Sequence, residues 1–151
     1  MSDAALRRLL DRAEISDLLT SFAQALDTKD WEGYAETFAE DGEFRIFDQV
    51  RVGRAEIAAG PARDLTRFAR TQHFSTNHVI EVDGDRARAQ SYMLAIHVPD
   101  AARPAEHADV GGTYRCECIR TSAGWRFQRV TIEVWWTAGA EFMIEHEGAT
   151  A

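Results

Sequence analysis

The N-terminal part of the chain carries apolar side chains at helical spacing. From Ala5 to about Leu26, apolar residues recur three or four positions apart, which predicts a helix with one buried face. A second helix is expected to begin after Asp30, a residue type that caps helix N-termini. The apolar residues of the two stripes are Ile15, Leu18, Leu19, Phe22 and Leu26 in the first, and Trp31, Tyr34, Ala35 and Phe38 in the second.

The next segment is punctuated by glycine and proline. Asp41 and Gly42 are typical of a turn, and residues 43–48 follow as a short predicted strand. Residues 53–70 again have helical character, but the Gly60-Pro61 pair interrupts them. Because proline breaks the hydrogen-bond ladder of a helix, we expect two short helices with a break between them.

From residue 71 onward the apolar period changes to two, which indicates strands. A first hairpin is predicted from residues 72–82 and 86–98, joined by the turn at residues 83–85. A loop with two prolines follows, and a second hairpin joins residues 110–120 to 125–137. As neighbours on the last strand, Trp135 and Trp136 are expected on opposite faces of the sheet.

The order of these elements predicts the fold class. Helices first and long strands afterwards indicate an α+β fold, with the helices packed on one face of a curved antiparallel sheet. A chain of 151 residues suits a single domain, with its core at about residues 5–137. The tail, residues 138–151, is expected to be partly ordered or to dock on a neighbouring subunit.

Charge and cysteine content narrow the possible partners. The chain has 17 basic and 25 acidic residues, a net charge of −8, without a Lys/Arg cluster, which argues against a nucleic-acid partner. No apolar run reaches the length of a membrane span, and the charged N-terminus has no signal-like apolar core. Cys116 and Cys118 share one face of a predicted strand and are poorly placed to bridge, which favours free thiols and a cytoplasmic location.

Asp27, His73 and His97 are the candidate catalytic residues. A neutral imidazole is a competent base near pH 7, and a carboxylate bound to its other ring nitrogen fixes the tautomer. Asp27 follows the apolar stripe of the first helix, His73 opens the first long strand and His97 closes its partner. The alternatives are a solvated carboxylate in an interhelix turn and a structural histidine. Strand alternation puts His73 and His78 on opposite faces, so the histidines predict no metal site.

Further residues are candidates for contact with a ligand. Small side chains on the face of His97 leave room for one, and a tyrosine hydroxyl on the strand of the two cysteines could bind it. The candidate substrate-binding residues are Phe22, Asn77, Tyr92, Met93, Tyr114 and Trp135.

Several motifs together carry a family resemblance. ALDTKDW after the amphipathic helix, TQHF at the start of a strand, the VDGD turn and GWRFQRVTIEVWW near the end resemble the SnoaL-like branch of the nuclear transport factor 2-like superfamily. Within that branch, the sequence is most similar to the scytalone dehydratases. The similarity covers about residues 5–137.

The resemblance implies a cone-shaped α+β barrel around a deep apolar cavity, and a homodimer or trimer that needs no metal or organic cofactor. In scytalone dehydratases an Asp–His pair and a second histidine surround a small cyclic substrate. These positions correspond to Asp27, His73 and, with a one-residue gap in the VDGD turn, His97. The family mechanism removes a proton beside a carbonyl and expels water from the next carbon.

The sequence departs from the scytalone dehydratases at two tyrosines that activate the substrate carbonyl. Leu26 occupies the position of the tyrosine that precedes the catalytic aspartate in those enzymes. The position of their second tyrosine falls near Ile46 or Phe47. Scytalone is therefore not the expected substrate, and Tyr114 or Tyr92 is the candidate replacement. The leading hypothesis is a dehydratase-type lyase; the alternatives are an isomerase or cyclase using the same pair, and a non-catalytic ligand-binding module resembling an oxygenase small subunit.

Overall fold

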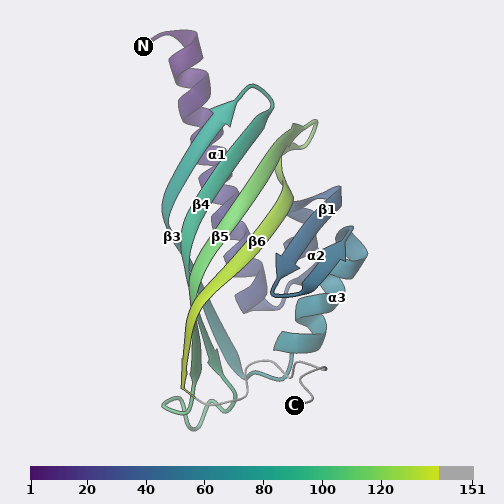
Figure 1. The fold of residues 1–151 in the computed structure, drawn as a ribbon, viewed down its shortest axis with the longest axis vertical. Helices are drawn as coiled ribbons and strands as arrows, with labels where there is room; N and C mark the ends of the chain where they lie inside the picture. Colours follow the sequence, from purple (N-terminus) through teal and green to yellow (C-terminus); the bar gives the residue numbers. More distant parts are fainter. Residues whose placement is uncertain (140–151) are drawn as a thin grey trace.

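The computed structural model describes residues 1–139, which form three helices and a six-stranded sheet (Figure 1). No helix within these residues is long and apolar enough to span a membrane. The helices are α1 (Asp3–Thr28), α2 (Trp31–Glu36) and α3 (Arg54–Leu65). The strands are β1 (Phe38–Ile46), β2 (Gln49–Val52), β3 (Arg70–Asp83), β4 (Arg86–Val98), β5 (Ala108–Thr121) and β6 (Gly124–Gly139).

The sheet is curved, mixed and open. Its strand order is β2-β1-β6-β5-β4-β3, and the β1–β6 pair is parallel while every other pair is antiparallel. The expected α+β class is confirmed, but the sheet is neither purely antiparallel nor closed into a barrel. In the sequence, β2 and α3 lie between β1 and the β3–β6 meander. β1 pairs with the free edge of β6, the last strand of that meander.

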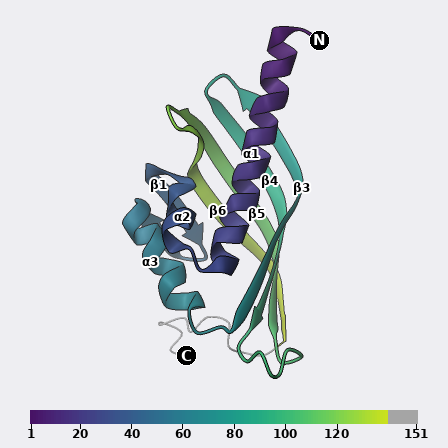
Figure 2. The ribbon, with the colours of Figure 1, turned by 180° about the vertical axis from the view of Figure 1, so that it is seen from behind.

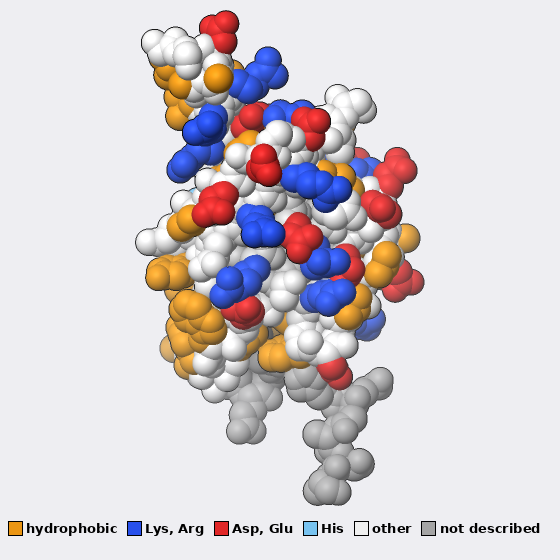
Figure 3. Space-filling view, turned by 45° about the horizontal axis from the view of Figure 1, so that its top comes forward, with side chains coloured by type: hydrophobic (Ala, Val, Ile, Leu, Met, Phe, Trp, Pro, Cys, Tyr) orange, Lys and Arg blue, Asp and Glu red, His pale blue; other side chains and the backbone are white. Residues whose placement is uncertain are grey.

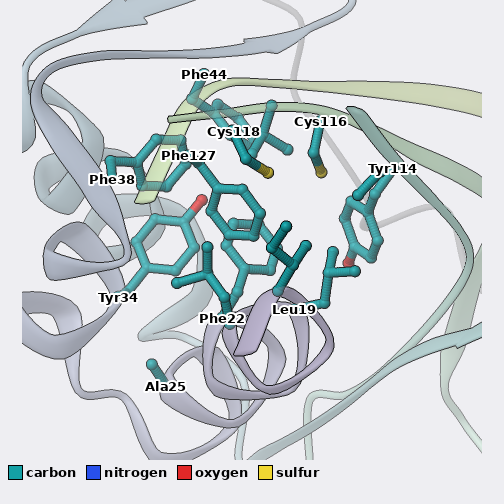
Figure 4. Packing of buried hydrophobic residues seen from close by; sticks show 14 of the residues in the cluster. Leu19, Phe22, Ala25, Tyr34, Phe38, Phe44, Tyr114, Cys116, Cys118 and Phe127 are labelled. Atoms are coloured by element: carbon teal, nitrogen blue, oxygen red, sulfur yellow. The ribbon is translucent and has the colours of Figure 1, made fainter. Parts of the chain in front are cut away.

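All three helices lie on one side of the sheet, which we call the inner face (Figure 2). Helix α1 runs along β3, and Asp30 caps α2 by accepting a hydrogen bond from the Gly33 N–H (2.9 Å). The apolar stripes of both helices meet the inner face in one core (Figure 4). Its largest fully buried side chains include Trp125, Tyr34, Tyr114, Phe22, Phe38 and Phe127.

The segment between α2 and β3 differs from the sequence-based expectation. Asp41 and Gly42 lie inside β1 instead of forming a turn, and β2 was not expected at all. A Cβ at residue 42 would lie 3.1 Å from the Phe127 carbonyl oxygen, so this glycine serves a close approach of two strands. Helix α3 continues through Pro61, so the expected break at Gly60-Pro61 is also wrong. Tertiary packing outweighs local propensity here.

Two irregularities in the strands change which faces side chains occupy. Asn77 has φ +56°, and the β3–β4 register shifts between Thr76 and Val79. This bulge brings His78 to the inner face, where it contacts Ser16 of α1 (2.8 Å), so the expectation that His73 and His78 face opposite ways is wrong.

The second irregularity lies in β6, opposite Gly111 and Gly112. Trp136 covers Gly111, and the Trp135 ring contacts Tyr92 at 5.8 Å. Both tryptophans therefore lie on the outer face, in contrast to the expected alternation. Figure 3 shows charged side chains of both signs across the sheet and hydrophobic side chains gathered at lower left. β6 runs to Gly139, and the rest of the expected tail lies outside the described residues.

Candidate active site

An apolar cavity of about 150 Å³ opens between the helices and the inner face of the sheet. A cavity of this size holds one six-membered ring. Most of its wall is apolar, with a few polar side chains among the apolar ones, which is the usual composition of a small-molecule site. The residues that line it include Phe22, Tyr34, Phe44, Arg51, His73, Met93, His97 and Tyr114.

The carboxylate of Asp27 is bound to His73 at the edge of this cavity. His73 Nδ1 lies 2.7 Å from Asp27 Oδ1, and the His73 backbone N–H donates to Oδ2 at 2.9 Å. The Thr71 hydroxyl donates to Oδ1 at 3.0 Å. Since the Asp27 side chain is a quarter exposed and holds three donors, it is not a solvated turn carboxylate.

Lys29 fixes the end of α1 in the position that allows Asp27 to contact His73. Lys29 adopts a left-handed conformation (φ 58°) that terminates the helix directly after Asp27 and Thr28. Its Nζ donates to the Phe68 carbonyl oxygen at 2.8 Å, just before β3 begins. The helix terminus and the segment before the strand are therefore tied together next to the Asp27–His73 pair.

This geometry sets the tautomer of His73. An ionised carboxylate can only accept, so the proton of the neutral ring lies on Nδ1. Nε2 is then left with its lone pair in a side chain that is only 6% exposed and lines the cavity. The arrangement can take a proton from a bound ligand and stabilise the imidazolium that forms.

His97 lies edge-on to His73, with ring centroids 5.4 Å apart. Burial lowers the pKa of His97 to about 4, and the neighbouring His73 contributes in the same direction, so this ring is neutral near pH 7. Its Nδ1 is buried without a hydrogen-bond partner in the described chain. A buried orphan atom of this kind is available to a ligand oxygen.

The structure separates the candidate contact residues into two groups. Phe22, Met93 and Tyr114 line the cavity, whereas Asn77, Tyr92 and Trp135 do not. Asn77 is exposed in the β3 bulge, and Tyr92 and Trp135 contact each other on the outer face. The bulges account for Asn77 and Trp135, whereas Tyr92 faces outward because it alternates with Met93 on β4.

Tyr34 and Arg51 are cavity residues that the sequence did not single out. Tyr34 belongs to the apolar stripe of α2 and was counted as core, and Arg51 lies on the unexpected strand β2. Both phenols, Tyr34 and Tyr114, contact the Phe22 ring, at 4.9 and 5.3 Å between centroids (Figure 4). Burial raises the pKa of each phenol, so both stay protonated and can donate. Among residues 1–139 no cluster of His, Cys, Asp and Glu could hold a metal ion.

Comparisons with known proteins place this fold. Similar solved structures include a provisionally assigned scytalone dehydratase from Novosphingobium aromaticivorans (24% identity, TM-score 0.79, covering 88% of this chain and 89% of that one). A protein of unknown function with a cystatin-like fold from Nostoc punctiforme is 30% identical (TM-score 0.72, 83% and 92% covered). A hexachlorocyclohexane dehydrochlorinase, LinA type 2, is 20% identical (TM-score 0.79, 95% and 99% covered).

No curated protein sequence matches the chain significantly. Residues 7–131 match the family model described as the SnoaL-like domain, which spans most of the sequence. The helices on a curved sheet, the cavity and this match agree. The chain therefore belongs to the SnoaL-like domain family.

Proposed function

We propose that the protein is a cofactor-independent lyase that removes water from a small, cyclic, mostly apolar hydroxy compound. The observation that carries this proposal is the 2.7 Å contact between Asp27 and His73 at an apolar cavity. It supplies a base of fixed tautomer, and the cavity accommodates one ring. A scytalone dehydratase and a dehydrochlorinase are both named for eliminations, and their structural similarity supports the same class of reaction here.

The elimination begins at the free nitrogen of His73. Nε2 takes the proton from the carbon beside the substrate carbonyl, and the C–H electron pair moves into the enolate. The enolate then forms the new C=C bond as the C–O bond of the neighbouring hydroxyl breaks. The leaving oxygen takes the proton from the imidazolium and departs as water, which returns His73 to its starting state. Asp27 stabilises the imidazolium throughout.

Two further cavity residues assist these steps in the proposal. His97, neutral and with an orphan ring nitrogen, binds the leaving hydroxyl. Tyr114, a protonated phenol, donates to the developing enolate oxygen. One positioned acid–base group contributes roughly 10²–10⁴-fold to a rate, so preorganised donors must supply the rest.

The test is turnover of single-ring β-hydroxy ketones, followed by absorbance of the conjugated product. His73→Ala should abolish turnover. His107→Ala is the matched control, because His107 also contacts an aspartate (Asp109, 2.7 Å) but belongs to a loop and does not line the cavity. Equal turnover by the parent and His73→Ala would refute the assignment.

An isomerase or cyclase is the second candidate, because the same pair could return the proton without expelling water. The mass of the product separates the two: loss of one water indicates elimination, and an unchanged mass indicates isomerisation. We further propose that the protein acts in the cytoplasm, where its two buried free thiols, Cys116 and Cys118, remain reduced.

A further inference from the structure

The cavity holds a positioned guanidinium that the elimination does not use. Arg51 lies on β2, at the opposite edge of the sheet from β3, which carries His73. Its side chain is only 12% exposed. Arg51 Nη2 donates to Gln49 Oε1 at 2.7 Å and to Asp64 Oδ2 at 3.0 Å. Because both acceptors bind the same nitrogen, they fix the orientation of the group and leave its other donors unused.

The guanidinium also contacts Phe44 and Gly60. Arg51 Cζ lies 5.5 Å from the centre of the Phe44 ring, in cation–π contact. It packs against Gly60 as well, where an added Cβ would lie 1.9 Å from Arg51 Nη1 and 2.2 Å from Cζ. A side chain at residue 60 is therefore incompatible with the present position of the guanidinium. This contact explains why a glycine occupies position 60 of the helix.

The charges around Arg51 favour an anion. Asp64 is shared, since it also accepts from Arg63 Nε at 2.9 Å. Two arginines and one aspartate leave this cluster with one net positive charge. Arg51 Nε and Nη1 have no hydrogen-bond partner within residues 1–139. The Tyr34 phenol, which lines the same cavity, likewise has no partner there and is an additional donor.

We propose that Arg51 and Tyr34 bind an anionic oxygen, a carboxylate or a phenolate, carried by the substrate ring away from the bond that breaks. That the bound molecule is a substrate rests on the proposed function, but the binding of the anion does not depend on catalysis. It narrows the substrate class from a mostly apolar hydroxy compound to a single-ring acid. Charge-assisted hydrogen bonds from a planar guanidinium are the interaction best suited to such an oxygen.

The test compares ligands of one size by calorimetric titration. Benzoate should bind more tightly than its neutral isostere benzamide, and 4-nitrophenolate shows whether a phenolate is preferred to a carboxylate. In Arg51→Met the preference for benzoate over benzamide should fall roughly 10- to 100-fold, the factor expected for loss of a charge-assisted hydrogen bond. Arg45→Met is the matched control, because Arg45 is half-exposed on the neighbouring strand, pairs with Glu43 and does not line the cavity.

Gly60→Ala provides a second variant that keeps every charge. Alanine favours a helix more than glycine, so the variant should fold, while its Cβ displaces the guanidinium. It should lose the benzoate preference as Arg51→Met does. The inference is overturned if the parent protein prefers neither benzoate nor 4-nitrophenolate to benzamide. It is also overturned if the preference for the anion is unchanged in Arg51→Met or in Gly60→Ala.

The two proposals fail in different ways. If benzoate selectivity depends on Arg51 but no hydroxy ketone is turned over, the anion site stands and the lyase assignment fails. If hydroxy ketones are dehydrated by the parent protein but benzoate selectivity is the same in the parent and in Arg51→Met, the lyase assignment stands and the anion site fails. His73→Ala should leave benzoate selectivity within about threefold of the parent value, because His73 is not part of the guanidinium cluster.

Discussion

Asp27→Asn is the substitution that most directly tests the chemistry of the cavity. The carboxylate accepts from three donors: His73 Nδ1 at 2.7 Å, the His73 backbone N–H at 2.9 Å and the Thr71 hydroxyl at 3.0 Å. Asparagine has nearly the same shape but only one acceptor atom. If its oxygen takes the place of Oδ2 and keeps the backbone N–H, its NH₂ group takes the place of Oδ1 and faces both His73 Nδ1 and the Thr71 hydroxyl. Nδ1 must then accept, so the ring proton moves to Nε2.

A proton on Nε2 blocks the base that faces the cavity. We expect kcat/KM to fall roughly 10²- to 10⁴-fold, which corresponds to about 3–5 kcal/mol of lost transition-state stabilisation. The folded state should lose far less, about 1–2 kcal/mol, because the backbone N–H keeps its acceptor, the Thr71 hydroxyl can rotate to accept from the NH₂ group, and the side chain is a quarter exposed. Activity and stability are thus affected to different degrees, which a merely structural role would not produce.

Two measurements check this reasoning. Turnover of an accepted hydroxy ketone gives kcat/KM, and ¹⁵N NMR of the histidine rings reports the tautomer of His73 without any substrate. Asp17→Asn is the control, since Asp17 lies on the exposed side of the same helix. The reasoning is refuted if Asp27→Asn retains kcat/KM within about threefold of the parent, or if His73 keeps its proton on Nδ1 in the variant.

Further predictions concern stability and association. The pKa of His97 is about 4 in the folded state, below its ordinary value near 6.5, so between these two pH values the unfolded chain binds more protons than the folded one. The free energy of unfolding, measured by urea titration, should therefore fall by about 2 kcal/mol from pH 7 to pH 5. His97→Gln should remove most of this change. Arg120→Met should cost about 3–5 kcal/mol in the same assay, because it strands the buried carboxylate of Asp11, which Arg120 now binds through two nitrogens at 2.7 and 2.9 Å. Tyr92 and Trp135 contact each other on the outer face and are 50% and 57% exposed, so we expect a homodimer or trimer that forms through this face. Light scattering should then find the Trp135→Glu variant monomeric. A monomeric parent protein would contradict the expectation.

Local pattern was sufficient for the regular elements. The three- and four-residue spacing from Ile15 to Leu26 predicted α1, and the turn at residues 83–85 predicted the β3–β4 hairpin, with β4 at its observed bounds. These features are decided by neighbours in sequence, through helix periodicity, strand alternation and turn chemistry. The family resemblance added the pairing of Asp27 with His73, which spacing alone left open between a catalytic pair and a solvated carboxylate.

Two of the misplaced residues lie at bulges. Asn77 was placed on the face of His73 by strict alternation and Trp135 was expected to face away from Trp136, but a bulge at Asn77 and another opposite Gly111 and Gly112 change the facing of these strands. Tyr92 lies on the outer face because it alternates with Met93, which lines the cavity. A bulge is set by the register of two strands that are distant in sequence. It leaves little trace in either strand by itself.

The sequence by itself thus determined the class of fold, the main helices and hairpins and the types of residue able to move a proton. Only the tertiary structure decided that the sheet is mixed and open, that Tyr34 and Arg51 belong to the cavity, and that His97 is buried with an orphan nitrogen. The physical reason is range: periodicity acts over a few residues, whereas a cavity wall and the burial of a charge depend on contacts between elements distant in sequence, such as α1 with β3 and β1 with β6. Those contacts exist only after the chain has closed on itself.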